Sequence, residues 1–171
     1  MLPPIDRLNA FDEASCAAAL GRLFENAPVF TARLCTARPF DTYGQMIEAA
    51  QQLAADLPTA AQDELIDGHP RIGADPATVS AISFREQGYD AAPPVDDSDL
   101  GAHLARLNDE YEARFGFRFV VFVNGRSRGE IAEVMTARMG EDREVERQRA
   151  LTDVFAIARS RLARLEGEEG R

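Results

Sequence analysis

Residues 100–125, LGAHLARLNDEYEARFGFRFVVFVNG, carry the clearest structural pattern in the chain. Apolar side chains recur there every three or four residues, which predicts a long amphipathic helix with one face formed by Leu100, Leu104, Leu107, Tyr111 and Phe115. The apolar run Phe119–Val123 follows, and by propensity it indicates a buried strand closed by Asn124–Gly125. Because a single strand leaves its backbone groups without partners, the alternative is irregular apolar backbone beneath the helices.

Helical spacing continues on both sides of this stretch. Ser127 and Glu130 stand at the spacing of a capping box, which marks a helix start. We expect the first helix to end at Ala27–Pro28 and residues 90–99 to be the least structured stretch. The helices outside the opening stretch are predicted to begin near Asp12, Pro28, Asp41 or Thr42, Pro58, Ser83, Ser127 and Asp142. The pattern by itself predicts a helical bundle with at most one short strand.

Length, composition and charge exclude several classes of protein. The chain has 171 residues, which suits one domain, and 45% of them are hydrophobic, as in globular proteins. The net charge of −10 disfavours binding to nucleic acid, and no apolar run is long enough to span a membrane. The sequence contains no lysine, so a Schiff base, a pyridoxal phosphate linkage and a P-loop are all excluded.

The chain has two cysteines, Cys16 and Cys35, which lack CxxC spacing. With only two histidines beside them, a zinc site is not expected. The first residues, MLPPIDRLNAF, have no basic region followed by a long apolar region. We therefore expect both cysteines to be reduced and the protein to be cytoplasmic.

The two histidines differ in their sequence context. His103 lies within the helical pattern and is interpreted as a partly exposed helix residue without a function. His69 follows the predicted helix end at Gly68, and Pro70 keeps it out of the helical conformation. A residue just beyond a helix end is a common position for a reactive group. A structural His favoured by the helix dipole fits the same position, and composition does not separate the two interpretations.

Two further polar features are candidates for a binding site. Glu86–Gln87 ends a short predicted helical turn, and a carboxylate beside a carboxamide can hydrogen-bond a urea or imide edge. Most pairs of this kind are ordinary exposed residues. In the last helix, Arg161 follows the apolar face and needs an anionic partner, whereas Arg159 and Arg164 are interpreted as solvated.

The order of these motifs closely resembles the OHCU decarboxylase family, where OHCU is 2-oxo-4-hydroxy-4-carboxy-5-ureidoimidazoline. The resemblance extends from about residue 5 to residue 166. It is carried by His69-Pro70-Arg71-Ile72-Gly73, Ser83-xx-Glu86-Gln87, Leu107-Asn108-xx-Tyr111-xx-Arg114-Phe115-Gly116-Phe117-x-Phe119-Val120 and the late Ile157-xxx-Arg161-Leu162, with further matches at Phe11, Arg38-Pro39-Phe40, Ile131, Arg138 and Glu146.

The resemblance implies an all-α, single-domain helical bundle over residues 1–171, with a frayed C-terminal tail, that forms a homodimer. It also implies that Phe119–Val123 is not a strand. The catalytic residues that it assigns are His69, as the acid/base, and Glu86. The substrate-binding residues that it assigns are Pro70, Ser83, Phe84, Arg85, Gln87, Phe119, Val120, Val121, Phe122, Val123 and Arg161.

The activity that the resemblance implies is conversion of OHCU to (S)-allantoin and CO2 without a metal or an organic cofactor. The enzyme would stabilise an enolate-like charge and protonate one face. We expect His69, near its reference pKa of about 6.5, to exchange the proton. Glu86 would orient His69 or bind N–H groups, Gln87 would read the urea edge and Arg161 would attract the anion. The alternatives are a hydrolase or isomerase of another cyclic ureide and a non-catalytic interaction module.

Overall fold

The computed structural model describes residues 2–75, 77, 79–87 and 98–167. All regular secondary structure within these ranges is helical, which confirms the all-α prediction. The helices are α1 (Ile5–Ala10), α2 (Glu13–Leu20), α3 (Pro28–Thr36), α4 (Tyr43–Ala55), α5 (Thr59–Asp67), α6 (Ala81–Glu86), α7 (Ser98–Phe115), α8 (Arg128–Arg138) and α9 (Arg143–Gly167). Residues 90–97 of the expected irregular stretch 90–99, and the expected frayed tail at 168–171, lie outside the described residues. The last two residues of that stretch, Ser98 and Asp99, are helical, since they begin α7.

Side-chain caps fix most of the predicted helix starts. The Asp12 carboxylate and the Thr42 hydroxyl accept hydrogen bonds from the first turns of α2 and α4. Ser127 and Glu130 form the predicted capping box at the start of α8. The first helix was predicted to reach Ala27–Pro28, and this is wrong: α2 ends at Leu20, and a turn with Asn26 at a φ of 50° leads into α3.

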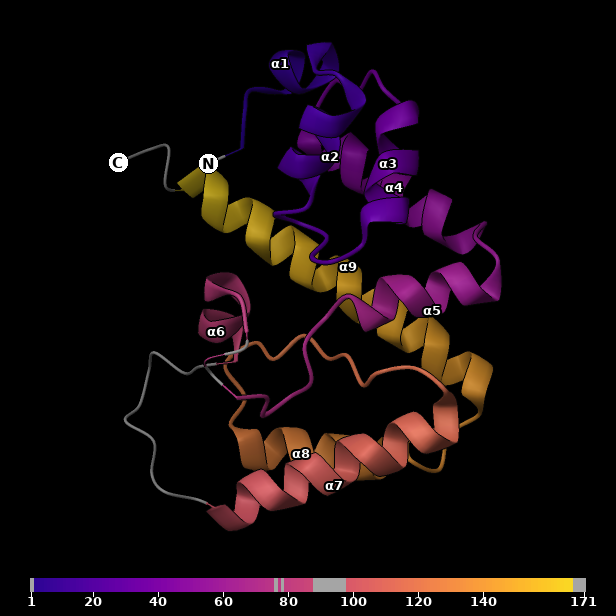
Figure 1. Ribbon diagram of the computed structural model, residues 1–171, viewed down its shortest axis with the longest axis vertical. Coiled ribbons are helices and arrows are strands. Elements are labelled where there is room, and N and C mark those ends of the chain that lie inside the picture. The colour runs from indigo at the N-terminus through magenta and orange to yellow at the C-terminus, as the bar shows by residue number, and fades with distance from the viewer. Residues whose placement is uncertain (1, 76, 78, 88–97, 168–171) are drawn as a thin grey trace.

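Helix α9, with 25 residues, is the longest of the described helices. It runs diagonally through the molecule, and α4 and α5 pack against it (Figure 1). Arg147 of α9 is buried and donates a hydrogen bond of 2.7 Å to Asp63 of α5. Helices α7 and α8 lie side by side at the other end of the molecule. No helix in the described ranges combines the length and the apolar character needed to cross a membrane.

The segment between α7 and α8 explains why an apolar run is extended without being a strand. The two helices run in the same direction, so the connecting chain must return along the length of the pair (Figure 1). Phe119–Val123 lies in this connection, and the propensity-based prediction of a strand there is wrong. Phe119 packs edge-on against Tyr111, with ring centroids 5.1 Å apart, and the Arg138 guanidinium lies 4.8 Å from the Phe119 ring centre. Side-chain packing therefore stabilises this segment in place of a sheet.

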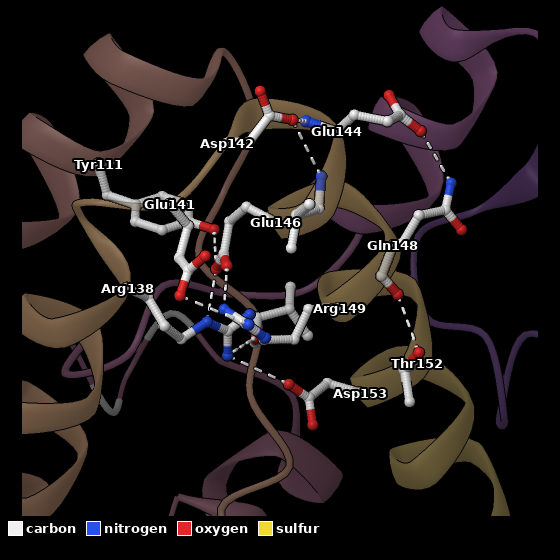
Figure 2. Close-up of polar contacts among 12 residues, drawn as sticks. Tyr111, Arg138, Glu141, Asp142, Glu144, Glu146, Gln148, Arg149, Thr152 and Asp153 are labelled. Atoms are coloured by element: carbon white, nitrogen blue, oxygen red, sulfur yellow. Dashed lines mark hydrogen bonds and ion pairs between the residues drawn. The ribbon is translucent and has the colours of Figure 1, made fainter.

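A buried carboxylate, Glu146, joins α7, α8 and α9. It is 0% exposed and accepts hydrogen bonds from the Tyr111 hydroxyl at 2.6 Å, from Arg138 and from Arg149 at 2.9 Å (Figure 2). Arg138 also contacts Asp153, at 3.2 Å. Burial raises the pKa of Tyr111, as does its hydrogen bond to Glu146, so the hydroxyl remains a donor. This cluster holds α7 and α8 against α9.

The expectation that the two cysteines are separate reduced thiols is wrong. Cys16 of α2 and Cys35 of α3 form a disulfide, with their Cα atoms 6.1 Å apart. CxxC spacing is not required, because α2 and α3 pack against each other and bring together residues 19 positions apart in the sequence. The bond therefore links the two helices in the N-terminal part of the fold.

We predict that Glu146→Gln lowers the free energy of unfolding by about 3 kcal/mol, because it removes the fully buried carboxylate of the Arg138 ion pair and leaves Arg138 only its longer contact with Asp153. Urea denaturation followed by circular dichroism measures the change. Glu110→Gln is the matched control, since it breaks the exposed ion pair with Arg106 and should cost less than about 1 kcal/mol. Equal losses in the two variants would contradict the role given to Glu146.

Candidate active site

A cavity of about 270 Å³ lies where α6, α9, the chain after α5 and the α7–α8 connection meet. This volume is near the lower end of the range for small-molecule sites. The predicted site residues that line it are His69, Pro70, Ser83, Arg85, Glu86, Gln87, Phe119, Val120, Val121, Phe122 and Val123. Phe84 and Arg161 are absent from its wall. The structure thus brings together residues from four separate parts of the sequence.

The His69 imidazole is the most unusual group in this wall. His69 is only 5% exposed, and neither ring nitrogen has a hydrogen-bond partner among the described residues. Its backbone, by contrast, is held at both ends: the His69 N–H donates to Ile66, and the His69 carbonyl accepts from Arg118 at 2.9 Å. Buried polar atoms are normally paired, so two ring nitrogens without a partner, in a residue that lines a cavity, indicate a ligand-binding position.

Gly68 allows His69 to approach the chain near Glu25. A Cβ atom on Gly68 would lie 2.4 Å from the Glu25 carbonyl oxygen, closer than any side chain tolerates. The Asn26 side chain then bonds the Gly68 carbonyl at 3.0 Å. The glycine that was read as a helix stop therefore has a second role, because it permits close packing between α5 and the α2–α3 turn.

The environment of His69 alters its acid–base behaviour. Burial lowers the pKa of His69, the positive charge of Arg161 also lowers it, and the negative charge of Glu25 opposes both effects, so that the net value is about 4. The expectation that His69 titrates near the ordinary value is therefore wrong. Near neutral pH the imidazole is uncharged, so one ring nitrogen accepts a hydrogen bond and the other donates one.

Arg161 organises the charged groups behind the cavity wall. It is 2% exposed, and its guanidinium donates to both oxygens of Glu86 at 2.7 Å, to Glu25 at 3.2 Å and to the Leu23 carbonyl at 3.2 Å. Burial lowers the pKa of Arg161, but the bonds and charges of Glu86 and Glu25 raise it by more. The guanidinium is thus charged and paired with protein groups, which favours a positioning role over the predicted contact with substrate.

Glu25 is a member of this cluster that sequence reasoning missed. It accepts a hydrogen bond of 2.6 Å from the Ser83 hydroxyl as well as the bond from Arg161. Burial raises the pKa of Glu25, but hydrogen bonds from Ser80 and Ser83 and the charge of Arg161 lower it by more, so the net direction is down. Glu25 lies in the turn after α2 and belongs to no motif, so its sequence context gave no signal.

Gln87 fixes the loop that follows His69. Its side-chain oxygen accepts from the Gly73 N–H at 3.0 Å, and its side-chain nitrogen donates to the Arg71 carbonyl at 3.1 Å. Gly73 has a φ of 76°, a conformation that favours glycine. The amide that was predicted to read a urea edge therefore also holds α6 against residues 71–73.

The extended connection supplies backbone groups to the cavity. The hydrogen bonds between described residues include none donated by the backbone N–H groups of Phe119–Val123. All five of these residues line the cavity. Backbone donors of this kind are fixed in space and can bind carbonyl or anionic oxygens without reorganisation.

Helix α9 contributes lining residues that were not predicted. Ile157, Ser160 and Arg164 lie three and four positions apart, so they share one face of the helix. This spacing was the available signal, but Arg164 was interpreted as solvated. It is exposed, as expected, and it also lines the cavity. The other unpredicted lining residues are Ile72, Asn124 and Gly125.

A second, shallow depression of about 510 Å³ lies against α7 and α8. It includes His103, which is exposed as predicted and whose ring nitrogen contacts Arg106 at 3.0 Å. Its other lining residues are Leu100, Gly129, Ala132, Glu133, Thr136 and Ala137. No buried polar atom without a partner faces it in the described part of the chain. The cavity at His69 is therefore the candidate active site.

Comparison with known proteins agrees with this geometry. The family model described as OHCU decarboxylase matches residues 9–163. The chain is 32% identical over 166 residues to "Uric acid degradation bifunctional protein PucL" of Bacillus subtilis (strain 168), covering 97% of this chain and 33% of PucL, so it spans about a third of that relative. It is 29% identical over 159 residues to "2-oxo-4-hydroxy-4-carboxy-5-ureidoimidazoline decarboxylase" of Haloferax volcanii, covering 93% of this chain and 94% of the relative.

Two solved structures share the fold. "Crystal structure of OHCU decarboxylase in the presence of (S)-allantoin" matches with a TM-score of 0.68 and 20% identity, over 91% of this chain and 98% of that one. "Crystal structure of (S)-allantoin synthase" matches with a TM-score of 0.68 and 19% identity, over 94% and 53%. At these identities the likeness shows the fold alone. The match of the family model over residues 9–163 goes further: this chain belongs to the OHCU decarboxylase family, a family of carboxy-lyases.

Proposed function

We propose that this chain is a cofactor-free decarboxylase that converts OHCU to (S)-allantoin and CO2 in urate breakdown. The observation that carries the proposal is the uncharged, buried His69 imidazole, which lines the cavity and whose two ring nitrogens have no hydrogen-bond partner among the described residues. Membership of the OHCU decarboxylase family supports the choice of substrate. The cavity also separates this function from that of an interaction module, which needs an exposed surface.

The substrate carries the electron acceptor that decarboxylation needs. Its carboxylate and hydroxyl share one ring carbon, next to the ureido-bearing carbon, which is doubly bonded to a ring nitrogen. When CO2 leaves, the electron pair of the broken carbon–carbon bond moves toward that double bond, and the nitrogen takes up a proton. The ureido-bearing carbon is then protonated, while the hydroxyl loses its proton and becomes the ring carbonyl. The substrate anion and one proton thus give neutral allantoin and CO2.

Neutral His69 is suited to the proton transfers. Its unprotonated nitrogen can accept the hydroxyl proton, and the imidazolium formed can return a proton to the neighbouring carbon. The charge of Glu25 favours the imidazolium, since it opposes the effect of burial on the pKa of His69. Because the ring reaches the substrate from one side of the cavity, protonation occurs on a single face, which accounts for one enantiomer of allantoin.

The other lining groups would hold the substrate. Glu86, oriented by its two bonds to Arg161, would accept hydrogen bonds from ureido or ring N–H groups. Gln87 would bind the ring, as would the backbone N–H groups of Phe119–Val123, which donate to no other described residue. Arg161 would act through Glu86 and Glu25 without touching the substrate.

The decisive assay uses OHCU generated in place by oxidising and hydrating urate. We predict that the protein accelerates loss of OHCU and gives an excess of (S)-allantoin, measured by circular dichroism, together with CO2 release. Ring opening without CO2 would indicate a hydrolase of the same ureide. If the rate and the enantiomeric ratio match those of a protein-free control, the proposed function is wrong.

The acid–base role of His69 makes a separate prediction. His69→Ala should lower kcat by at least about a hundredfold, because the group that moves the proton is lost. In the wild type the active form is the neutral imidazole, so kcat/KM should hold from pH 8 to about 5 and fall as the pH approaches about 4. His103→Ala, at an exposed helix position, should leave rate and profile unchanged. A fall in kcat/KM with its midpoint near pH 6.5 would contradict the lowering of the pKa of His69 by burial.

Two further properties stay predictions. The family resemblance favours a homodimer, so light scattering should give about twice the 18.8 kDa mass of one chain. A monomer at the concentrations of the assay would show that the partner is not needed.

The expected cytoplasmic location conflicts with the Cys16–Cys35 disulfide, since cytoplasmic thiols are kept reduced.

A further inference from the structure

One face of α9 places a positively charged side chain in the cavity wall. Ile157, Ser160 and Arg164 form the stripe of this helix that lines the wall. Arg161 lies on the neighbouring stripe of the helix, where its guanidinium forms ion pairs with Glu86 and Glu25 behind the cavity wall. Arg164 is both exposed and cavity-lining, so it lies where the cavity meets solvent.

The guanidinium of Arg164 is available for a ligand. The hydrogen bonds and ion pairs between described residues include none made by Arg164. The other exposed arginine nearby in α9, Arg159, bonds the Gln51 side chain at 2.6 Å. Arg164 is therefore the arginine of this helix segment that faces the cavity without a protein partner.

The charges around the cavity favour an anion despite the net charge of −10. Among the described residues that line the cavity, the charged side chains are Arg85, Glu86 and Arg164, because His69 is neutral near neutral pH. Behind the wall, the charges of Arg161 and Glu25 cancel. Two cations thus oppose one carboxylate, which creates a local positive field in a negative protein.

We propose that Arg164 recognises the carboxylate of the anionic ureide substrate at the cavity mouth, with Arg85 as the second cation. This specificity role rests on the proposed function. OHCU is an anion, whereas allantoin is neutral once CO2 has left. Arg164 would therefore attract the anionic substrate but would not hold the neutral product. The loss of the substrate's charge on decarboxylation would thus favour release of the product.

The test compares two ureides that differ in charge. Allantoate is an anion with two ureido groups, and allantoin is its neutral cyclic counterpart. In calorimetric titrations of the full chain at low salt, Arg164→Gln should weaken allantoate binding about tenfold and leave allantoin binding unchanged. The allantoate effect should shrink as the salt concentration rises. With OHCU, the same variant should raise KM about tenfold while kcat changes less than twofold.

Arg159→Gln is the matched control, since it removes an equal charge from the same helix away from the cavity, and it should behave as the wild type. If both variants lost affinity for allantoate, the loss would be explained by the change in the protein's net charge, and the proposal would be overturned. Unchanged allantoate binding in Arg164→Gln, or equal weakening of allantoin, would also overturn it. Failure of the proposed function is a distinct result, because the wild type would then not decarboxylate OHCU whatever the titrations show.

Discussion

The site depends on one buried guanidinium. Arg161 joins Glu86 of α6, Glu25 of the α2–α3 turn and the Leu23 carbonyl to α9, so a single side chain holds three distant segments around the cavity. Two carboxylates this close to each other repel unless a cation lies between them. Removing that cation would leave both of them half-buried and unpaired, a penalty of several kcal/mol. The cluster is therefore stable only as a unit.

The burial that makes this ion cluster necessary also sets the chemistry of His69. In a low-dielectric wall, the imidazolium is costly, and the nearby Arg161 charge adds to the cost. The result is a neutral ring that both donates and accepts. Glu25 moderates the effect and favours the protonated ring when a proton arrives. The same few charges thus position the site and adjust the proton affinity of its central residue.

Helix α9 combines structural and chemical roles along its length. Near its start, Glu146 ties α7 and α8 to it through Tyr111 and Arg138. That attachment sets the course of the extended α7–α8 connection, which forms one wall of the cavity. Further along, the helix provides Arg161 behind the wall and Arg164 on it. A change at one end of α9 can therefore reach the site through a rigid element.

The sequence by itself determined the features that depend on neighbouring residues: the capped helix starts, the amphipathic α7, the helix end before His69 and the family motif. Only the tertiary structure decided the features that depend on distant ones. Phe119–Val123 has strand propensity, but side-chain packing holds it as a crossover. Arg161 meets Glu25 across 136 positions of sequence, and the cavity that Arg164 lines forms only when α6, α9 and the α7–α8 connection pack together. Ion pairing determines the partners of Arg161, and burial together with the nearby charges determines the pKa of His69. Neither property exists until remote segments of the chain pack together.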